Sequence, residues 1–375
     1  MRPAASAIPQ RPMPDDMHPT ALRRGWTTGS CATAAARAAF EALVTGAFPD
    51  PVSILLPGGA RASFALATSA LEGDIARVGI VKDAGDDPDV THGALVVASV
   101  RRAAAGSGLR FRAGSGVGTV TRAGLPLPVG EPAINPVPRA MIAAALAEVA
   151  RAHATHADAE VEISIPGGEK LAERTLNGRL GIVGGLSILG TTGIVVPYSC
   201  AAWIDTIFRG IDVARAAGLT HVAGATGSTS EAAVKALYGL PEIALIDMDD
   251  FVGGMLKYLR KHPVARVTIA GGFAKMAKLA QGRLDLHSKR GAVDLEWLAD
   301  AARKAGGDVA LAARIKTANT AMEACGLAEE SGIDLPERVA EAACRAAAKA
   351  VGQTAITLDV AVFDRVGMLL ARYPP

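Results

Sequence analysis

The stretch HVAGATGSTSE, residues 221–231, carries the clearest signal of the fold. An apolar strand (221–225) ends in small residues, and a helix follows directly after the turn. The same order returns at EIALID (242–247) and RVTIAGG (266–272), and TAITLDVAVF (354–363) ends the series as a strand. Strands that alternate with helices pair in a parallel or mostly parallel sheet. The back half of the chain is therefore predicted to be α/β.

Toward the N-terminus the pattern changes to hairpins. SILLPGGARASFAL (53–66) and EISIPGGEKLAERTL (162–176) both suggest strand, Pro-Gly-Gly turn and strand, either as a duplicated unit or by chance. The front half is expected to be mixed α+β. We predict two domains after a flexible tail (1–20): a hairpin-rich α+β substrate-binding domain (21–190) and an α/β cofactor-binding domain (191–375).

Composition excludes several classes of protein. Half of the 375 residues are apolar and 20% are charged, which supports a large core and excludes global disorder. A net charge of +2 and an aromatic content of 4% provide neither a basic face nor a stacking surface for nucleic acid. The four cysteines show neither metal-ligand nor disulfide spacing, so we expect no metal and a reducing, cytoplasmic location. Residues 180–204 lack charged side chains, but their glycines favour strands and turns over a membrane span.

The segment GWTTGSC (25–31) opens an alanine-rich helix with hydroxyls, glycines and a cysteine. Three interpretations remain open: a cap formed by Thr28 or Ser30, a nucleophilic Cys31, or an anion cradle in which Gly29 exposes helix amides. Cys31 has no base beside it in the sequence and is expected to be a packing residue. The helix mouth resembles the phosphate loop of homoserine-kinase and mevalonate-kinase type enzymes, which gives a rival class.

The loop KDAGDDPDVTHG (82–93) crowds four aspartates together. Such a group can cap turns, hold a hard cation, or serve acid–base chemistry, and crowding raises carboxyl pKa values. We predict that Asp86 or Asp87 accepts a proton from the substrate. His287, in the polar segment LDLHSK (284–289), is the alternative base.

The loop GEPAINPVPR (130–139) contains three prolines before a helix. Its simplest role is a helix entry. Its functional interpretation is that a stiff loop presents Asn135 and Arg139 to a polar ligand, since the planar Arg fork suits carboxylates.

Glycine turns in the back half indicate a crevice at the sheet edge. Ser228 and Glu231 are expected to form a capping box, and open α/β sheets bind nucleotides beyond the carboxyl ends of their strands. An acidic residue about twenty positions further on often accepts ribose hydroxyls, and AGGFAK (270–275) repeats the glycine turn. The candidate cofactor-binding residues are Gly224, Thr226, Gly227, Ser230, Asp250, Gly271 and Gly272.

Taken in order, nine segments resemble the CbiD family, the cobalt-precorrin-5B (C-1)-methyltransferases of cobalamin synthesis. They run from residue 22 to beyond residue 320: LRRGWTTGSCATAAA, DAGDDPDVTHG, INPVPR, GTTGIVVPYS, TGSTSE, DFVGGMLK, GGFAKMAKLAQG, HSK and ANTA. Two details depart from the family pattern. Asp249 stands where a glycine is expected before the Asp-Phe pair, and AGGFAK differs from the commoner Gly-x-x-Gly-Lys form.

The resemblance implies methyl transfer from S-adenosylmethionine to carbon 1 of (cobalt-)precorrin-5B, a ring-contracted tetrapyrrole, to give (cobalt-)precorrin-6A. It implies that neighbouring enzymes of the corrin pathway are partners to consider. We expect neither nucleic acid nor a membrane as a partner. A carboxylate clamp for the tetrapyrrole is expected from Thr27, Thr28, Gly29, Ser30, Asn135 and Arg139. The rival interpretations are an ATP-dependent small-molecule kinase and a non-catalytic tetrapyrrole carrier.

Overall fold

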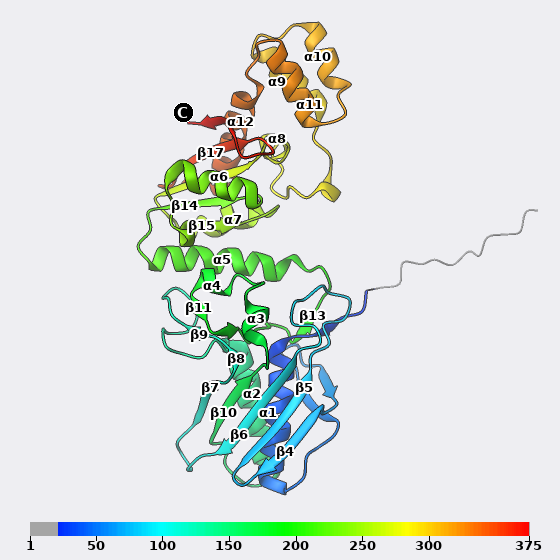
Figure 1. The fold of residues 1–375 in the computed structure, drawn as a ribbon, viewed down its shortest axis with the longest axis vertical. Coiled ribbons are helices and arrows are strands. Elements are labelled where there is room, and N and C mark those ends of the chain that lie inside the picture. The colour runs from blue at the N-terminus through cyan, green and yellow to red at the C-terminus, as the bar shows by residue number, and fades with distance from the viewer. Residues whose placement is uncertain (1–21, 375) are drawn as a thin grey trace, which may run out of the picture.

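A computed structural model describes residues 22–374 (Figure 1). The molecule is elongated, and helix α5 (Cys200–Ala216) lies across its middle (Figure 1). We call the elements before α5 the front part and those after it the back part. The predicted tail, residues 1–20, lies outside the described residues, and the domain boundary at residue 190 stays a prediction. Within residues 22–374, no helix is long and apolar enough to cross a membrane.

The front part is built on a five-stranded sheet backed by two helices. The strand order is β4 (Thr68–Glu72), β5 (Ile75–Val81), β6 (Leu95–Arg102), β10 (Ala159–Ser164) and β7 (Leu109–Ala113). Only β10 and β7 pair in parallel. Helices α1 (Thr28–Thr45) and α2 (Pro136–Ala152) pack together and form the front core with alternate residues of the strands.

The N-cap of helix α1 is neither of the two expected residues, Thr28 and Ser30. Thr27 is the N-cap, and its Oγ1 accepts a hydrogen bond from the Ser30 amide at 3.2 Å. The helix ends at Gly46, whose φ of 82° suits a residue without a Cβ atom. Because α1 is packed between the sheet and α2, its small alanines allow close approach over most of its surface.

The two Pro-Gly-Gly segments fold differently. The first forms the predicted hairpin of β2 (Val52–Leu55) and β3 (Arg61–Phe64). The second leads from β10 into helix α3 (Gly168–Ala172), so the predicted second hairpin is wrong, and with it the duplication. Glu, Lys, Leu and Ala, which follow the second Pro-Gly-Gly, are good helix formers. Gly168 also packs closely on Gly116: a Cβ added at Gly168 would lie 2.4 Å from the Gly116 carbonyl oxygen.

Short strands and one turn of helix complete the front part beside α5. They are β1 (Gly25–Trp26) with β13 (Ile194–Val195), β8 (Gly116–Val117) with β12 (Gly185–Leu186), β9 (Thr119–Val120) with β11 (Ile182–Val183), and α4 (Asn177–Leu180). As expected, residues 180–204 consist largely of turns and short strands until α5 begins.

The back part contains the predicted, mostly parallel sheet. Its order is β15 (Leu245–Asp247), β14 (His221–Ala225), β16 (Arg266–Gly272), β17 (Thr357–Phe363) and β18 (Leu369–Tyr373), and only β18 is antiparallel. The mixed α/β fold class is therefore confirmed. Residues 242–244, expected at the start of a strand, form the 3-10 helix η1 (Glu242–Ala244).

Helices cover both faces of this sheet. One face packs on α5, α7 (Val252–Leu259), α8 (Phe273–Ala280) and α12 (Leu335–Val351), and the other on α6 (Ser228–Tyr238). The side chains of β14 alternate accordingly, with Val222 toward the first group and Ala223 and Ala225 toward α6. Helices α9 (Leu295–Lys304), α10 (Val309–Lys316) and α11 (Ala321–Glu330) extend the end farthest from the front part (Figure 1), and the 3-10 turn η2 (Ser288–Arg290) lies in the loop that leads from α8 to α9.

The predicted capping box of α6 is absent. Gly227 is the N-cap and forms no side-chain cap, while the Ser230 hydroxyl donates to the Gly227 carbonyl at 2.9 Å. Glu231 instead reaches across to the front part and binds Arg179 of α4 through two hydrogen bonds of 2.6 and 2.9 Å. This bidentate pair ties the two parts together beside α5.

Cys31 is fully buried on α1, and burial raises the pKa of its thiol to about 12. The thiol therefore stays protonated near neutral pH, which excludes it as a nucleophile. We expect Cys31→Ser to lower the free energy of unfolding by about 1–2 kcal/mol, because a hydroxyl replaces a thiol among apolar side chains. Turnover of the folded variant should match that of the parent. Urea unfolding and initial rates check both expectations, and a folded but inactive variant would restore the nucleophile.

Candidate active site

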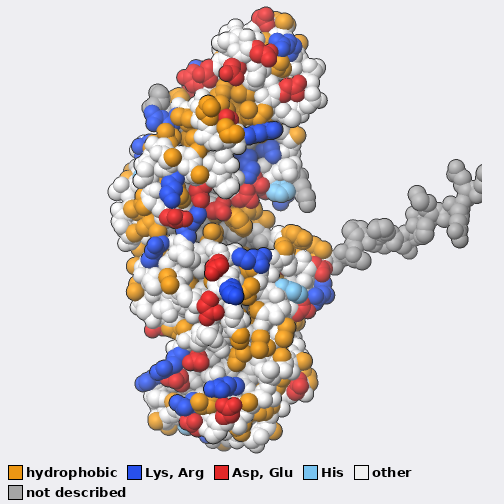
Figure 2. Space-filling view, viewed as in Figure 1, with side chains coloured by type: hydrophobic (Ala, Val, Ile, Leu, Met, Phe, Trp, Pro, Cys, Tyr) orange, Lys and Arg blue, Asp and Glu red, His pale blue; other side chains and the backbone are white. Residues whose placement is uncertain are grey.

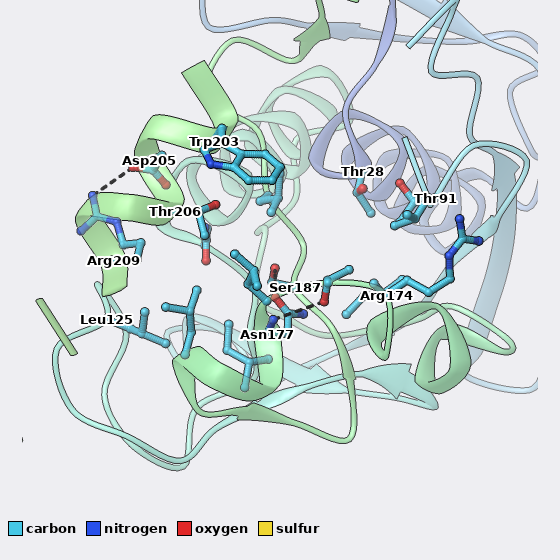
Figure 3. Close-up of a pocket in the computed structure, with 18 of the residues that line it drawn as sticks. Thr28, Thr91, Leu125, Arg174, Asn177, Ser187, Trp203, Asp205, Thr206 and Arg209 are labelled. Atoms are coloured by element: carbon cyan, nitrogen blue, oxygen red, sulfur yellow. Dashed lines mark hydrogen bonds and ion pairs between the residues drawn. The ribbon is translucent and has the colours of Figure 1, made fainter. Parts of the chain in front are cut away.

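A cavity of about 580 Å³ lies between the front part and α5 (Figure 3). Its volume is typical of a small-molecule site. Trp203 and Thr206 extend toward it from α5, while Thr28 and Thr91 lie on the opposite wall (Figure 3). In the space-filling view the molecule is indented between its two parts, with acidic, basic and histidine side chains along the rim (Figure 2).

Only one residue of the predicted helix mouth lines this cavity, Thr28. The expectation of free amides is wrong at Thr27 and Gly29, whose N–H groups donate to the carbonyls of Gly193 at 3.1 Å and Leu189 at 3.0 Å. The Ser30 hydroxyl likewise donates to the Gly193 carbonyl at 2.7 Å. The mouth is thus closed by the chain's own backbone, and any role of Thr27, Gly29 and Ser30 in substrate binding would be indirect.

Of the two residues expected to act from the proline-rich loop, Asn135 lines the cavity and Arg139 does not. The Arg139 guanidinium donates to the Ile134 carbonyl and the Glu131 carboxylate, both at 2.8 Å, and lies over the Phe111 ring. These contacts fix the loop, so a substrate carboxylate would have to displace them.

The sequence interpretation missed Arg174, a better-placed cation for substrate carboxylates. It follows α3 and lies on the cavity wall (Figure 3). Its guanidinium forms no hydrogen bond or ion pair within residues 22–374, whereas Arg209, on the α5 side, is bound to Asp205 and Asp212. An arginine in an irregular segment after a glycine turn carries no distinctive sequence signal.

The two aspartates predicted as bases lie outside the cavity lining. Asp86 is exposed and accepts the Arg23 amide at 2.6 Å, while Asp87 accepts the Tyr198 amide at 2.8 Å. Both side chains therefore hold backbone segments. The loop reaches the cavity through Asp89, Val90 and Thr91 instead.

Charges in this loop lower carboxyl pKa values, contrary to the expected rise. A hydrogen bond from Arg23 holds the pKa of Asp83 at about 2. Burial raises the pKa of Asp89, but the ammonium of Lys82 and hydrogen bonds from Thr91 outweigh it, and the net shift is downward. Lys82 is only 2% exposed and is paired with Asp89.

A second cavity, of about 430 Å³, lies at the carboxyl edge of the back sheet. Thr226, Gly227, Ser230 and Gly272, all predicted to bind the cofactor, line it. An added Cβ at Gly227 or Gly272 would meet nothing within 4 Å, so both residues border open space. The structure thus brings together part of the predicted set.

Gly224, Gly271 and Asp250 are not part of this lining. An added Cβ would lie 2.4 Å from the Met255 sulfur at Gly224 and 2.6 Å from the Met276 methyl carbon at Gly271, so both glycines serve internal packing. Asp250 is 7% exposed and paired with Lys275 at 3.2 Å, and its predicted contact with a ribose stays a prediction.

Lys275, in the first turn of α8, is the cation that the sequence interpretation missed in this cavity. Its ammonium donates to the Thr226 carbonyl at 2.7 Å and to the Asp249 carboxylate at 2.9 Å. Burial lowers its pKa, but Asp249 and Asp250 more than compensate, so the net shift is upward and the charge is retained. Lys275 is the last residue of the AGGFAK turn, so the sequence segment that predicted a ligand site already contained this cation.

His287 lies outside the linings of both cavities. It is exposed, and its amide donates to the Asp285 carboxylate at 3.1 Å. Its predicted role as a base for the substrate therefore has no support from its position.

The linings of the two cavities share no residue, but they approach each other at the end of β15. Asp247, the last residue of β15, lines the large cavity and pairs with Ala225, which directly precedes the turn that lines the second cavity. The Met248 amide donates to the Ala225 carbonyl at 3.1 Å, and the indole N–H of Trp203 donates to the Asp247 carbonyl at 3.2 Å.

Comparisons with known proteins show the family of this chain. The family profile described as CbiD matches residues 15–197, and the profile described as CbiD, C-terminal domain, matches residues 285–374. A protein named cobalt-precorrin-5B C(1)-methyltransferase from Bradyrhizobium sp. is 67% identical over 94% of this chain and 93% of its own length. The chain belongs to the CbiD family.

Two further CbiD relatives bear the same name. That of Methylorubrum extorquens is 64% identical, over 94% of this chain and 97% of its own length, and that of Agrobacterium fabrum is 65% identical, over 94% and 93%. A crystal structure titled cobalamin biosynthesis protein (cbiD) from Archaeoglobus fulgidus is 28% identical, with a TM-score of 0.39, and the match covers 72% of this chain and 83% of that one.

Proposed function

We propose that this CbiD-family chain transfers a methyl group from S-adenosylmethionine to carbon 1 of precorrin-5B, or its cobalt complex. The observation that carries the proposal is the 67% identity to a cobalt-precorrin-5B C(1)-methyltransferase over nearly the whole of both chains. A C-methyltransferase needs a site for the acceptor and a site for the methyl donor. The two neighbouring cavities offer one for each.

The tetrapyrrole is assigned to the large cavity. Its wall combines apolar side chains, suited to the ring, with polar groups, suited to peripheral acetate and propionate carboxylates. The polar side chains on this wall that can donate are Thr28, Asn135 and Arg174. Thr91, Asn177 and Ser187 also line it, but they already donate to Asp89, to the Gly185 carbonyl and to Asn177. Trp203 supplies a flat apolar surface from the α5 side (Figure 3).

The second cavity suits S-adenosylmethionine. Ser228 and Thr229 stand in the first turn of α6, where amides have no preceding helical carbonyl, and can donate to a carboxylate or a hydroxyl of the ligand. The hydroxyls of Thr226 and Thr229 add polar contacts, and Phe273 and Met322 add apolar surface. When bound, the donor supplies an already activated methyl group, so the protein's main contribution is alignment with the acceptor carbon.

The rival kinase hypothesis loses its main support. It required helix-mouth amides that cradle phosphate, but the amides of Thr27 and Gly29 are occupied by carbonyls of the same chain. The carrier hypothesis predicts pigment binding without chemistry. Incubation with S-adenosylmethionine labelled in its methyl group and precorrin-5B, with and without cobalt, separates these cases. Label at carbon 1 supports the proposal, and bound but unlabelled pigment contradicts it.

Replacing Arg174 by Ala tests the placement of the tetrapyrrole. Because its guanidinium can pair with a substrate carboxylate, we expect KM for the precorrin to rise about tenfold, equivalent to about 1.4 kcal/mol. The methyl-donor KM and kcat should change little. Lys170→Ala is the matched control, since Lys170 is exposed on α3 and lies outside the cavity lining. Equal precorrin KM values for both variants and the parent would move the carboxylate site elsewhere.

A further inference from the structure

Methyl transfer to a ring carbon requires a proton acceptor. The carbon–sulfur bond of the sulfonium breaks with its electron pair left on sulfur, and π electrons of the ring form the new carbon–carbon bond. The donor thereby loses its positive charge, and the methylated ring releases one proton to restore its own charge. The base must lie where the acceptor lies, in the large cavity.

The lining of that cavity contains few groups that can take a proton. Among the described residues 22–374 it includes no histidine, cysteine, lysine or tyrosine, and the four carboxylates there belong to Asp89, Glu173, Asp205 and Asp247. Glu173 is exposed, and Asp205 is exposed and paired with Arg209 at 3.2 Å. Asp89 is held by Lys82 and Thr91, which favour its ionised form and make it a weak base. Asp247 is the remaining candidate.

Asp247 lies where acceptor and donor must meet. It ends β15 on the wall of the large cavity, and it pairs with Ala225, one residue before the second cavity's lining begins at Thr226. The bond from the Trp203 indole to its carbonyl fixes its backbone beside the proposed ring site. A carboxylate at this junction is near the carbon that receives the methyl group.

The charges around Asp247 favour a base of intermediate strength. Burial raises its pKa, Glu231 of α6 and neighbouring Asp249 raise it further, and Arg179 of α4 lowers it. Arg179 is itself engaged by Glu231 through two hydrogen bonds, so its charge is largely compensated. The net shift is upward. On α5, Asp205 and Arg209 line the same cavity as an ion pair. A carboxylate whose pKa is shifted toward neutral pH accepts a proton more readily than an ordinary carboxylate.

We propose that the Asp247 carboxylate accepts the proton released from the tetrapyrrole during methyl transfer. The assignment rests on the function proposed above. It replaces Asp86, Asp87 and His287, which lie outside the cavity lining.

The test is Asp247→Asn in the full chain, assayed with labelled S-adenosylmethionine and precorrin-5B. We expect kcat to fall about 100-fold or more, while the dissociation constants of both substrates stay within about twofold, because the amide keeps the shape of the side chain. The parent kcat should rise with pH as Asp247 ionises, and this limb should be absent in the variant. Asp300→Asn, exposed on α9, is the control expected to match the parent.

The outcomes separate the two proposals. A parent chain that transfers no methyl group overturns the function and the assignment together. An active parent with an equally active Asp247→Asn variant overturns the assignment alone. Asp247→Glu covers the case in which the Asn variant does not fold: it should retain the pH-dependent limb, displaced, at a reduced kcat. An unchanged kcat with an unchanged limb in the Glu variant would overturn the assignment.

Discussion

Replacement of Gly227 by Val is expected to weaken binding of S-adenosylmethionine by about 100-fold or more, about 2.8 kcal/mol, in a chain that remains folded. Gly227 borders the second cavity, and an added Cβ there would meet nothing within 4 Å. The branched side chain would therefore occupy ligand space and meet no protein atom, although φ of 159° at Gly227 strains the backbone of any residue with a Cβ atom. Precorrin binding should persist, because the proposed tetrapyrrole site lies in the other cavity. Calorimetric titration with each substrate measures both affinities.

The matched control for this variant is Gly59→Val. Gly59 lies in the turn between β2 and β3 and lines neither cavity; its φ is also positive, at 85°, and an added Cβ there would likewise meet nothing within 4 Å. Its affinity for the methyl donor should equal that of the parent. Undiminished donor binding by the Gly227 variant would remove the donor from the second cavity.

A second large effect is expected on stability. Asp89→Asn leaves the ammonium of Lys82, which is 2% exposed, without its counter-charge. Removal of one partner of a buried ion pair costs about 3–5 kcal/mol, and because the Asp89 side chain is 23% exposed we expect about 3 kcal/mol. Urea unfolding at neutral pH measures the change. The Lys82→Met/Asp89→Leu double variant should recover most of the loss, since it removes both charges.

The pH dependence of stability gives an independent check on this pair. The pKa of Asp89 is lower in the folded chain than in the unfolded chain. Its contribution to stability is therefore complete above the unfolded pKa and is lost as pH falls through the folded pKa. The parent should lose more stability on acidification than the Asp89→Asn variant. Parallel acid profiles for the two proteins would show that the pair contributes little.

The sequence was most informative where a local pattern has a single structural solution. The alternation after residue 198 could form only a mostly parallel sheet, and it also located Thr226, Gly227 and Gly272 at one edge. It was least informative where long-range contacts decide. The Gly29 amide donates to the Leu189 carbonyl, and Arg179 pairs with Glu231. The two residues of each pair lie far apart in the chain, so no local sequence pattern could reveal them.

The proposed base was missed for a related reason. The sequence interpretation named Asp86, Asp87 and His287 as candidate bases, and near the end of β15 it named only Asp250, as a ribose contact about twenty residues after the glycine turn. In the structure Asp247, the last residue of β15, lines the large cavity, while Asp250, in the turn that follows, is buried and paired with Lys275. Which of several neighbouring carboxylates faces a cavity depends on the arrangement of α5 and α4, and the sequence does not specify that arrangement.

The bidentate pair between Arg179 and Glu231 has a consequence for how the two substrates act on each other. It joins α4, beside the large cavity, to the first turns of α6, beside the second cavity. A ligand that shifts one helix must therefore move or strain the other. If the donor changes the acceptor's affinity by some factor, thermodynamic reciprocity requires the acceptor to change the donor's affinity by the same factor. Calorimetry in either order of addition must then return one coupling free energy.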